Sequence, residues 1–445
     1  MIKRKDITPE SYPSLSPFPC KNLPFLSAFA SCHACKRCYI ISLKFLMRKE
    51  PLMFGNTFGR LFRITCSGES YSGGFRKNPN IPQELYGGLI TIVDGVPAGI
   101  KITSELVQAE LDKRKPGQTP LDSPRKEKDR VYIFSGVMEN DLTTGAPVGM
   151  IIPNNDIQDE HIDQYRGYKD EIRPGHAEYG FFKKYGEHAD WVGAGRASGR
   201  ETASRVAGGA VAKAILEKMG IDVVAYTIAS HGLKVDHDLS YEEVKANYRK
   251  NEINCPDLAL AEKMKEDVMK IKGAGDTAGG IIECIAHGVP AGLGEPVFDK
   301  MSALLAHAVC SIGAIKGIEF GAGFEVANML GSQSNDAAYV DPETGKVRFK
   351  TNHAGGILGG ITTWEDIRFR CAVKPTPTVS VPQHTVNVKE MKDVILSPIT
   401  RRDPTLLPRI YPVIEAMTRC ALLDAIYMAE AYWKVSGIDE KWLKI

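Results

Sequence analysis

The sequence lacks several features that would assign it at once to a large class of proteins. Its 445 residues contain no apolar run of the roughly 18 residues needed to cross a bilayer, so we expect no membrane association. The formal net charge is only +2, which gives no reason to expect a nucleic-acid partner. There is no GxxxxGK[ST] phosphate loop, no GxGxxG between a strand and a helix and no GxSxG elbow. An NTPase, a Rossmann dehydrogenase and an ordinary hydrolase are therefore unsupported.

The sequence also has no closely spaced cysteines after residue 52. Most of the ten cysteines stand singly in apolar segments, as expected for buried thiols in a reducing cytoplasm: Cys66, Cys284, Cys310, Cys371 and Cys420.

The first 52 residues differ from the rest, because Pro, Ser, Cys and basic residues dominate them without periodicity. Cys32, Cys35 and Cys38 have CxxCxxC spacing, but no fourth metal ligand stands at a spacing that compels a site. We interpret residues 1–52 as a disordered extension or a mis-assigned start, with Met53 as a natural start.

Residues 53–445 read as one large domain, because no linker interrupts them. Two copies of GVPAG, at residues 95–99 and 288–292, each follow a predicted strand and precede a predicted helix. Five identical residues with matched flanks favour an internally duplicated α+β core over chance similarity of turns. The patterns predict strands over 58–65, 89–93 and 281–286, helices over 104–114, 258–272, 300–312 and 412–433, a hairpin around 341–345 and an extended segment over 373–381.

Residues 193–220 predict a glycine-rich loop that leads into a helix with an anion site at its start. Ser198 is a good N-cap, Glu201 completes a capping box, and Gly220 is a plausible stop. Arg196 and Arg200 flank the free N–H groups at the positive end of the helix dipole. An ordinary capped helix with two solvated arginines is the alternative. Its inward face is predicted to hold Ala203, Val206, Ala207, Ala210, Val211, Ala214 and Ile215.

Further basic and flexible segments follow the same chemistry. A site assembled from them would hold a multiply anionic small molecule, because arginine forks match carboxylate and phosphate oxygens. Taken singly, each segment reads better as a solvated basic loop. The segments are 113–117, 173–176, 374–378 and 401–404.

Taken together and in order, these motifs resemble the chorismate synthase family from Gly55 to about Ala431. The motifs that carry the resemblance are GNTFGRLFRIT (55–65), VDGVPAGI (93–100), RPGHAEY (173–179), GRASGRET (195–202), GVPAGLGEPVFDK (288–300), NHAGGILGGIT (352–362), KPTPT (374–378) and RRDPTLLPRIYPVIEAM (401–417).

The resemblance implies an α+β fold, a β-α-β sandwich with an internal pseudo-two-fold repeat, in a cytoplasmic homotetramer. It implies a lyase that converts 5-enolpyruvylshikimate 3-phosphate to chorismate by anti-1,4-elimination of phosphate, the last step of the shikimate pathway towards aromatic amino acids. The reaction needs reduced FMN without net redox change. The source of the reduced flavin stays open between NADPH as an indirect reductant and an external flavin reductase.

The resemblance also implies roles for individual residues. Catalysis would involve His176 beside the flavin, Asp403 as proton relay, and Tyr71, Ser70 and Ser198. Substrate would be bound by Arg114 and Arg200, with Ser70 nearby. FMN would be held by Arg196, Ala197, Ser198, Gly313, Ala314, Gly359, Lys374, Pro375, Thr376, Pro377, Thr378 and Arg401.

The chain departs from the family pattern at the site itself. Tyr71 stands where the family usually has a histidine that protonates the leaving phosphate, and residues 73–86 look like an insertion with Arg76 and Lys77. Tyrosine, with a reference pKa near 10, donates a proton less readily at neutral pH. A divergent active enzyme and a non-catalytic flavin- or phosphate-binding paralogue both stay open, as does a flavin reductase that uses NADPH. Smaller departures are Arg402, Pro120 and Gly313.

Overall fold

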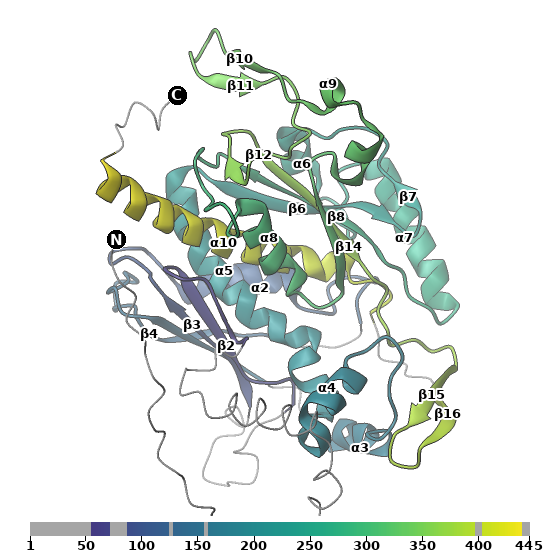
Figure 1. Cartoon of the computed structure of the whole chain (residues 1–445). Coiled ribbons are helices and arrows are strands. Elements are labelled where there is room, and N and C mark those ends of the chain that lie inside the picture. The colour runs from purple at the N-terminus through teal and green to yellow at the C-terminus, as the bar shows by residue number, and fades with distance from the viewer. Residues whose placement is uncertain (1–54, 72–86, 124–127, 155–158, 397–402, 438–445) are drawn as a thin grey trace, which may run out of the picture. The chain divides into compact units, whose positions relative to one another are not determined.

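The computed structural model describes residues 55–71, 87–123, 128–154, 159–396 and 403–437, and those from Gly55 onward form one compact unit (Figure 1). The expectations for residues 1–52 and 73–86, and those for Arg401 and Arg402, fall outside these ranges. The description below therefore concerns only the unit that follows Phe54.

Two five-stranded antiparallel sheets form the outer layers of this unit. The first has the strand order β1-β2-β3-β5-β4, and the second has the order β7-β6-β8-β14-β9. The strands of the first sheet are β1 (Thr57–Phe58), β2 (Arg63–Ser67), β3 (Gly88–Asp94), β4 (Tyr132–Ser135) and β5 (Val148–Pro153). Those of the second are β6 (Asp222–Ser230), β7 (Leu233–Lys234), β8 (Gly280–His287), β9 (Ile315–Phe320) and β14 (Ile367–Val373).

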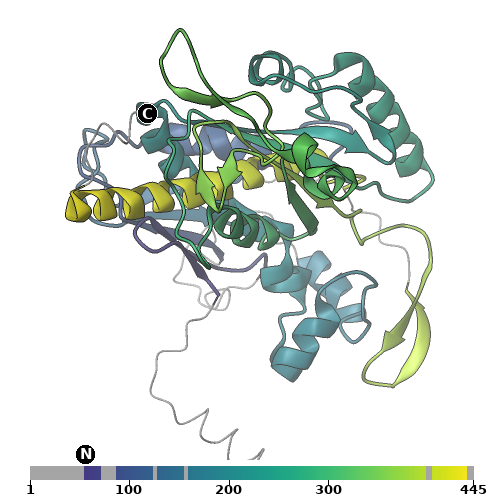
Figure 2. The ribbon, with the colours of Figure 1, turned by 45° about the horizontal axis from the view of Figure 1, so that its top comes forward.

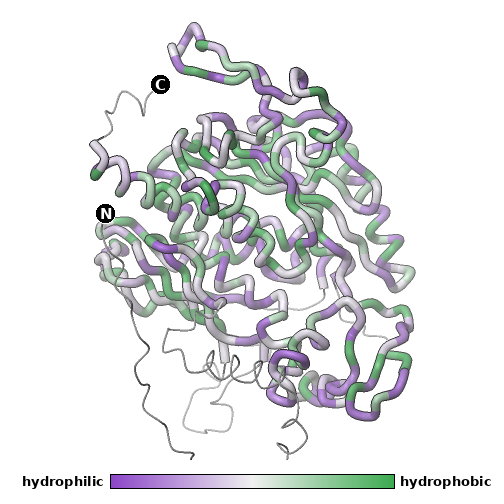
Figure 3. The backbone as a smooth tube through the Cα atoms, in the orientation of Figure 1, coloured by the Kyte–Doolittle hydropathy of each residue, from purple (hydrophilic) through white to green (hydrophobic). Residues whose placement is uncertain are grey.

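Helices fill the space between the sheets (Figures 1 and 2). Helix α5 (Thr202–Leu216) packs on β2 and β3 of the first sheet, and α10 (Leu407–Ser436) packs on β6 and β8 of the second. The two helices pack on each other, and α2 (Ser104–Arg114) contacts both. This arrangement confirms the predicted β-α-β sandwich. Figure 3 shows hydrophobic residues running through these central strands and helices.

Helices α5 and α10 are buried around nearly their whole circumference, whereas a helix with a single apolar face would be buried on one side only. In α5 the predicted inward residues are all buried, and so are Gly208 and Gly209. A Cβ added at Gly209 would lie 2.3 Å from the Cβ of Ala416, so the glycine lets α10 approach closely. In α10 the apolar residues Ile414, Met417, Ala421 and Ala425 are buried and Met428 is half-buried, and Glu415, Arg419 and other polar residues are buried as well.

The two GVPAG turns have the same conformation and equivalent partners. In the first turn, Thr143 Oγ1 donates to Pro97 O at 2.5 Å and accepts from Ile100 N at 2.9 Å. In the second turn, Thr362 Oγ1 donates to Pro290 O at 2.6 Å and accepts from Leu293 N at 2.9 Å. The flanking glycines all have positive φ: Gly95, Gly99, Gly288 and Gly292. Because β3 and β8 are each the central strand of a sheet, this match supports the predicted duplication.

Several predicted boundaries needed correction. The stretch 58–65 holds the end of β1, a turn and the start of β2 rather than one strand. Ser198 caps a short 3₁₀ turn (Gly199–Glu201) by accepting from Arg200 N at 3.3 Å, and Glu201 pairs with Arg205 instead of closing a capping box. Cys310 is exposed because it is the last residue of α8 (Met301–Cys310), beyond the packed part of that helix. Helix α10 begins five residues before the predicted start at Pro412.

The other predicted elements are confirmed within a few residues. They include α2, which has the predicted bounds, and the hairpin of β10 (Ala338–Val340) and β11 (Val347–Phe349). The remaining elements are α3 (Asp159–Gly167), α4 (Glu178–Tyr185), α6 (Tyr241–Asn247), α7 (Leu258–Gly273), α9 (Gly331–Ser334), β12 (Ile357–Leu358), β13 (Ile361–Thr362), β15 (Gln383–Asn387), β16 (Lys392–Leu396), and 3₁₀ turns at Gly186–His188, Val192–Ala197, Glu217–Met219 and Gly323–Asn328.

Candidate functional site

A cavity of about 540 Å³ lies where the loops of the central layer meet. This volume lies within the range that small-molecule and cofactor sites usually occupy. Segments far apart in the sequence build its wall: the C-terminal end of α2, residues 173–177, 193–199, 311–316 and 374–378, and the first turns of α10.

The lining of this cavity is strongly cationic. Seven of its residues are Arg or Lys, whereas two, Glu201 and Asp403, are acidic. Such an excess inside a partly enclosed site favours a ligand that carries several negative charges. The basic residues are Arg114, Arg173, Arg196, Arg205, Arg409, Lys316 and Lys374.

The loop before α5 presents backbone at the cavity in a left-handed conformation. Gly193, Ala194 and Gly195 have φ values of 63°, 68° and 48°. A Cβ on Gly193 would lie 2.4 Å from the Tyr71 ring, so only glycine leaves room for this tyrosine. Arg196, the next residue, donates from Nη1 to Gly68 O at 2.9 Å and is thereby tied to the segment that leads to Tyr71.

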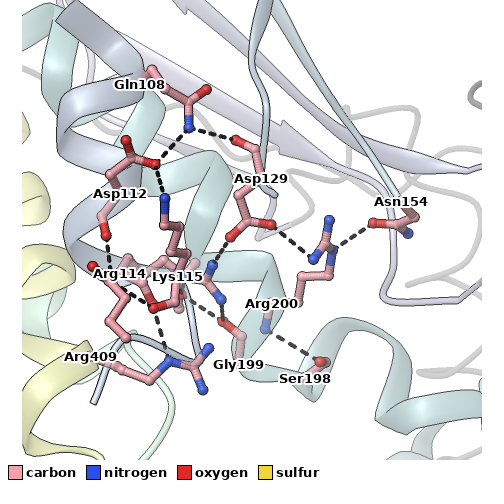
Figure 4. A network of polar contacts seen from close by, with 12 residues as sticks. Gln108, Asp112, Arg114, Lys115, Asp129, Asn154, Ser198, Gly199, Arg200 and Arg409 are labelled. Carbon is pink, nitrogen blue, oxygen red and sulfur yellow. Dashed lines mark hydrogen bonds and ion pairs between the residues drawn. The ribbon is translucent and has the colours of Figure 1, made fainter. Parts of the chain in front are cut away.

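A buried ion-pair network lies behind Arg114 (Figure 4). The carboxylate of Asp129 lies between two guanidiniums, 2.5 Å from Arg114 Nη1 and 2.9 Å from Arg200 Nη1. Burial by itself would raise the pKa of Asp129, but the two arginines outweigh burial and lower it. Arg200 also donates to Asn154 Oδ1 at 2.6 Å. Of the two arginines, Arg114 lines the cavity and Arg200 does not.

Asp403 lies in the cavity wall with a fixed carboxylate. Its Oδ2 accepts from Arg409 Nη1 at 2.7 Å, and its Oδ1 accepts from Ser123 N at 2.8 Å. Arg409 Nε in turn donates to Arg114 O at 3.1 Å. These contacts tie the start of α10 to the end of α2 and hold the carboxylate at the cavity.

His176 is held by a neighbouring carboxylate. Its Nδ1 lies 3.1 Å from Glu178 Oε2 and 2.8 Å from the backbone N of Ala177. Glu178 also pairs with Arg173, whose Nε donates to Oε1 at 2.6 Å. Burial would raise the pKa of Glu178, but His176 and Arg173 lower it, which keeps the carboxylate ionised.

The cavity wall also contains two lysines, Lys316 and Lys374, and two buried hydroxyls. Burial and, second, the charge of Lys316 lower the pKa of Lys374, whose Nζ donates to Gly175 O. Thr376 Oγ1 is buried without a hydrogen-bond partner among the described residues, and so is Ser123 Oγ. Buried polar atoms are normally satisfied, so these two hydroxyls fit a polar ligand in the cavity.

Most of the predicted site residues that the structure describes meet in this cavity. They are Tyr71, Arg114, His176, Arg196, Ala197, Ser198, Gly313, Ala314, Lys374, Thr376, Pro377, Thr378 and Asp403. Four others do not line it: Ser70, Arg200, Pro375 and Gly359, the last in the turn between β12 and β13.

Sequence reasoning missed several residues of the wall. Ser123, Arg205, Lys316 and Arg409 line the cavity, yet none stood out from its neighbours in the sequence. The only local signal was the four-residue spacing of Glu201 and Arg205, which form an i,i+4 ion pair at 3.1 Å.

Two further classes of site find no support in the described part of the chain. Among those residues, no cluster of His, Cys, Asp and Glu could hold a metal ion. The described helices also include none that is both long and apolar enough to cross a bilayer. The CxxCxxC motif at 32–38 lies outside the ranges that the structure describes.

Comparisons with known proteins agree with this geometry. Residues 86–427 match the family model described as chorismate synthase. The chorismate synthase of Acetivibrio thermocellus is 65% identical over 391 residues, which cover 88% of this chain and 99% of that protein. That of Methanocella arvoryzae is 47% identical over 84% of this chain and 94% of its own length. A crystal structure of a chorismate synthase superposes with a TM-score of 0.63 at 28% identity, covering 83% of this chain and 93% of that one.

Proposed function

The chain belongs to the chorismate synthase family, and from this membership we propose the substrate, cofactor and residue roles that follow. Its function is that of a chorismate synthase, a carbon–oxygen lyase of aromatic biosynthesis. The substrate is 5-enolpyruvylshikimate 3-phosphate, which loses phosphate by anti-1,4-elimination to give chorismate. The observation that carries this assignment is the cationic cavity, whose wall suits both the carboxylates and the phosphate of such a substrate.

The cavity also suits reduced FMN. Thr376 Oγ1 and Ser123 Oγ are buried without described partners, and Lys374 and Lys316 supply positive charge beside Thr376. We assign FMN to Arg196–Ser198, Gly313–Ala314 and Lys374–Thr378. Gly359 does not line the cavity, and the contact predicted for Arg401 lies outside the described residues. When bound, reduced FMN supplies electron density and, at N5, a base for the substrate's C6 proton.

The protein's own groups then carry out three tasks. Arg114 binds the anionic substrate at the cavity wall, and Arg200 supports it from behind. Asp403, oriented by Arg409 and Ser123 N, relays the proton taken from C6. His176, held by Glu178, sets the protonation of the flavin.

The donation of a proton to the leaving phosphate is the step in which this chain departs from its family. Tyr71 lies in the cavity wall, and its ring meets that of Tyr165 edge-on at a centroid distance of 5.6 Å. Its hydroxyl is the proton or hydrogen-bond donor that we assign to the departing phosphate, with Ser70 beside it. Ser198 caps the 3₁₀ turn before α5 and lines the cavity, and we assign it a place beside the bound anion.

We extend the proposal to assembly and supply. Several large apolar side chains are exposed, as an interface between copies would require: Phe298 at 88%, Phe324 at 82% and Leu330 at 68%. A homotetramer would cover them, and light scattering on the purified chain tests this assembly. We place the enzyme in the cytoplasm, where an external flavin reductase or NADPH provides reduced flavin. NADPH oxidation by the chain alone would identify it as its own reductase.

The decisive experiment is chorismate formation by purified protein with substrate and chemically reduced FMN, followed by absorbance. Product formation without net flavin oxidation is the expected result. Flavin binding without turnover would instead support the non-catalytic paralogue, which the 65% identity to a chorismate synthase disfavours.

A further inference from the structure

The centre of the ion-pair network is a buried aspartate to which sequence reasoning assigned no role. Asp129 is 2% exposed and lies between the guanidiniums of Arg114 and Arg200, which are 2% and 6% exposed (Figure 4). Of the three, only Arg114 lines the cavity. One carboxylate therefore pairs with two arginines, one of which lines the cavity, without lining the cavity itself.

The two arginines connect Asp129 to the elements that surround the cavity. Arg114 donates from Nε to Thr202 Oγ1 at 2.9 Å and from Nη2 to Gly199 O at 3.2 Å, at the start of α5. Arg200 donates to Asn154 Oδ1 at 2.6 Å, and Asn154 Nδ2 donates to Ser70 O at 2.8 Å. The network thus runs from the end of α2 to the residue that precedes Tyr71.

We propose that Asp129 is a positioning residue for substrate: it orients the guanidinium of Arg114 towards the anionic ligand and, through Arg200 and Asn154, holds the Ser70–Tyr71 segment. This inference rests on the proposed function. Asp129 does not touch the reacting atoms, so it acts only through the residues it holds.

The backbone at this position agrees with a positioning role. Asp129 has φ of 44°, a left-handed conformation that aspartate and asparagine adopt more readily than most other residues. Two guanidiniums that share one buried carboxylate would repel each other without it, because charges interact strongly away from water. Asparagine at this position keeps the shape and the backbone conformation, but it accepts from one arginine only and presents an N–H₂ group to the other.

A simple charge effect predicts the opposite outcome from positioning. If Asp129 only neutralised positive charge, removing its carboxylate would leave a more cationic site that binds anions more tightly. If Asp129 orients Arg114, the same change lets the guanidinium move and weakens binding. The sign of the change in substrate affinity therefore separates the two models.

The test compares Asp129→Asn with Asp222→Asn in the full-length protein. Asp222 is also an aspartate in an ion pair, with Lys245, and accepts from Tyr241 at 2.7 Å, but it does not line the cavity. Titration calorimetry with oxidised FMN present measures substrate Kd without turnover, and assays with reduced FMN give KM and kcat.

We expect Asp129→Asn to raise substrate Kd and KM about tenfold or more, as loss of a charge-assisted contact would. FMN affinity stays within twofold, and Asp222→Asn leaves substrate Kd unchanged. An unchanged or lower substrate Kd in Asp129→Asn overturns the inference. A wild-type chain that binds substrate but forms no chorismate overturns the proposed function instead, while the Kd comparison still decides the role of Asp129.

If thermal unfolding shows that Asp129→Asn is not folded, a second variant replaces it. Asn154→Ala interrupts the same network between Arg200 and Ser70. The expected result is a slower kcat, because the segment that holds Tyr71 loses its anchor, with unchanged FMN affinity. A wild-type kcat in this variant overturns the proposed network.

Discussion

The two GVPAG turns share sequence, backbone conformation and threonine partners, whereas the segments around the cavity share none of these with one another. Neither turn contributes to the described lining of the cavity. Each turn connects the central strand of a sheet to the chain that follows, and it depends on one buried threonine. The cavity wall instead combines single residues from loops that occur once. The comparison indicates that duplication built the scaffold, and unique loops supplied the chemistry.

The largest expected effect comes from removing chemistry while the scaffold stays intact. Asp403→Asn keeps the size of the side chain but removes the carboxylate held by Arg409 and Ser123 N. We expect kcat for chorismate formation to fall about 10³-fold, the range for loss of a proton-transfer group. FMN affinity and melting temperature stay near wild type. A kcat within fivefold of wild type would remove Asp403 from proton relay.

The converse change damages the scaffold far from the ligand. Gly209→Ala places a Cβ 2.3 Å from the Ala416 Cβ, where α5 and α10 cross. We expect a loss of about 1–3 kcal/mol or more in the free energy of unfolding, with an unchanged KM for folded protein. Gly180→Ala, in α4, is the matched control, because a Cβ there meets nothing within 4 Å. Equal melting temperatures for the two variants would contradict the close packing.

A paired substitution tests whether the two repeats are energetically equivalent. Thr143→Val and Thr362→Val each remove a buried hydroxyl that donates to a proline carbonyl and accepts from a backbone N–H. We expect each variant to lose about 1–3 kcal/mol of stability, because buried backbone groups lose their partner. Denaturant unfolding measures both. Losses that differ by more than twofold would show that only one turn still serves the scaffold.

The smallest effect concerns the residue that departs from the family. Tyr71→Phe keeps the ring that packs on Gly193 and Tyr165 but removes the hydroxyl. We expect kcat to fall several-fold to about tenfold, since one hydrogen bond of about 1 kcal/mol is lost to the departing phosphate. FMN affinity stays near wild type. Unchanged turnover would exclude the hydroxyl from phosphate release.

Local sequence patterns predicted an element well where its own caps and its charged ends define its bounds. Helix α2 has the predicted bounds, because Thr103 caps it and its charges lie at the expected ends. Helix α10 was predicted to begin five residues too late and to end three residues too early, because burial between two sheets hides the periodicity that marks a helix with one solvent-exposed face. The capping box at Ser198 was wrong, because Glu201 finds a better partner in Arg205.

The sequence by itself determined the family, because the motifs that carry the resemblance are local and occur in order along the chain. The sandwich of two sheets around helices and most of the residues that line the cavity followed from that resemblance. Only the tertiary structure decided that Arg200 lies behind Arg114, that Ser123, Lys316 and Arg409 complete the wall, and that Asp129 joins two arginines. These facts depend on contacts between segments up to hundreds of residues apart. Such contacts are set by how the layers pack, and no local pattern encodes them.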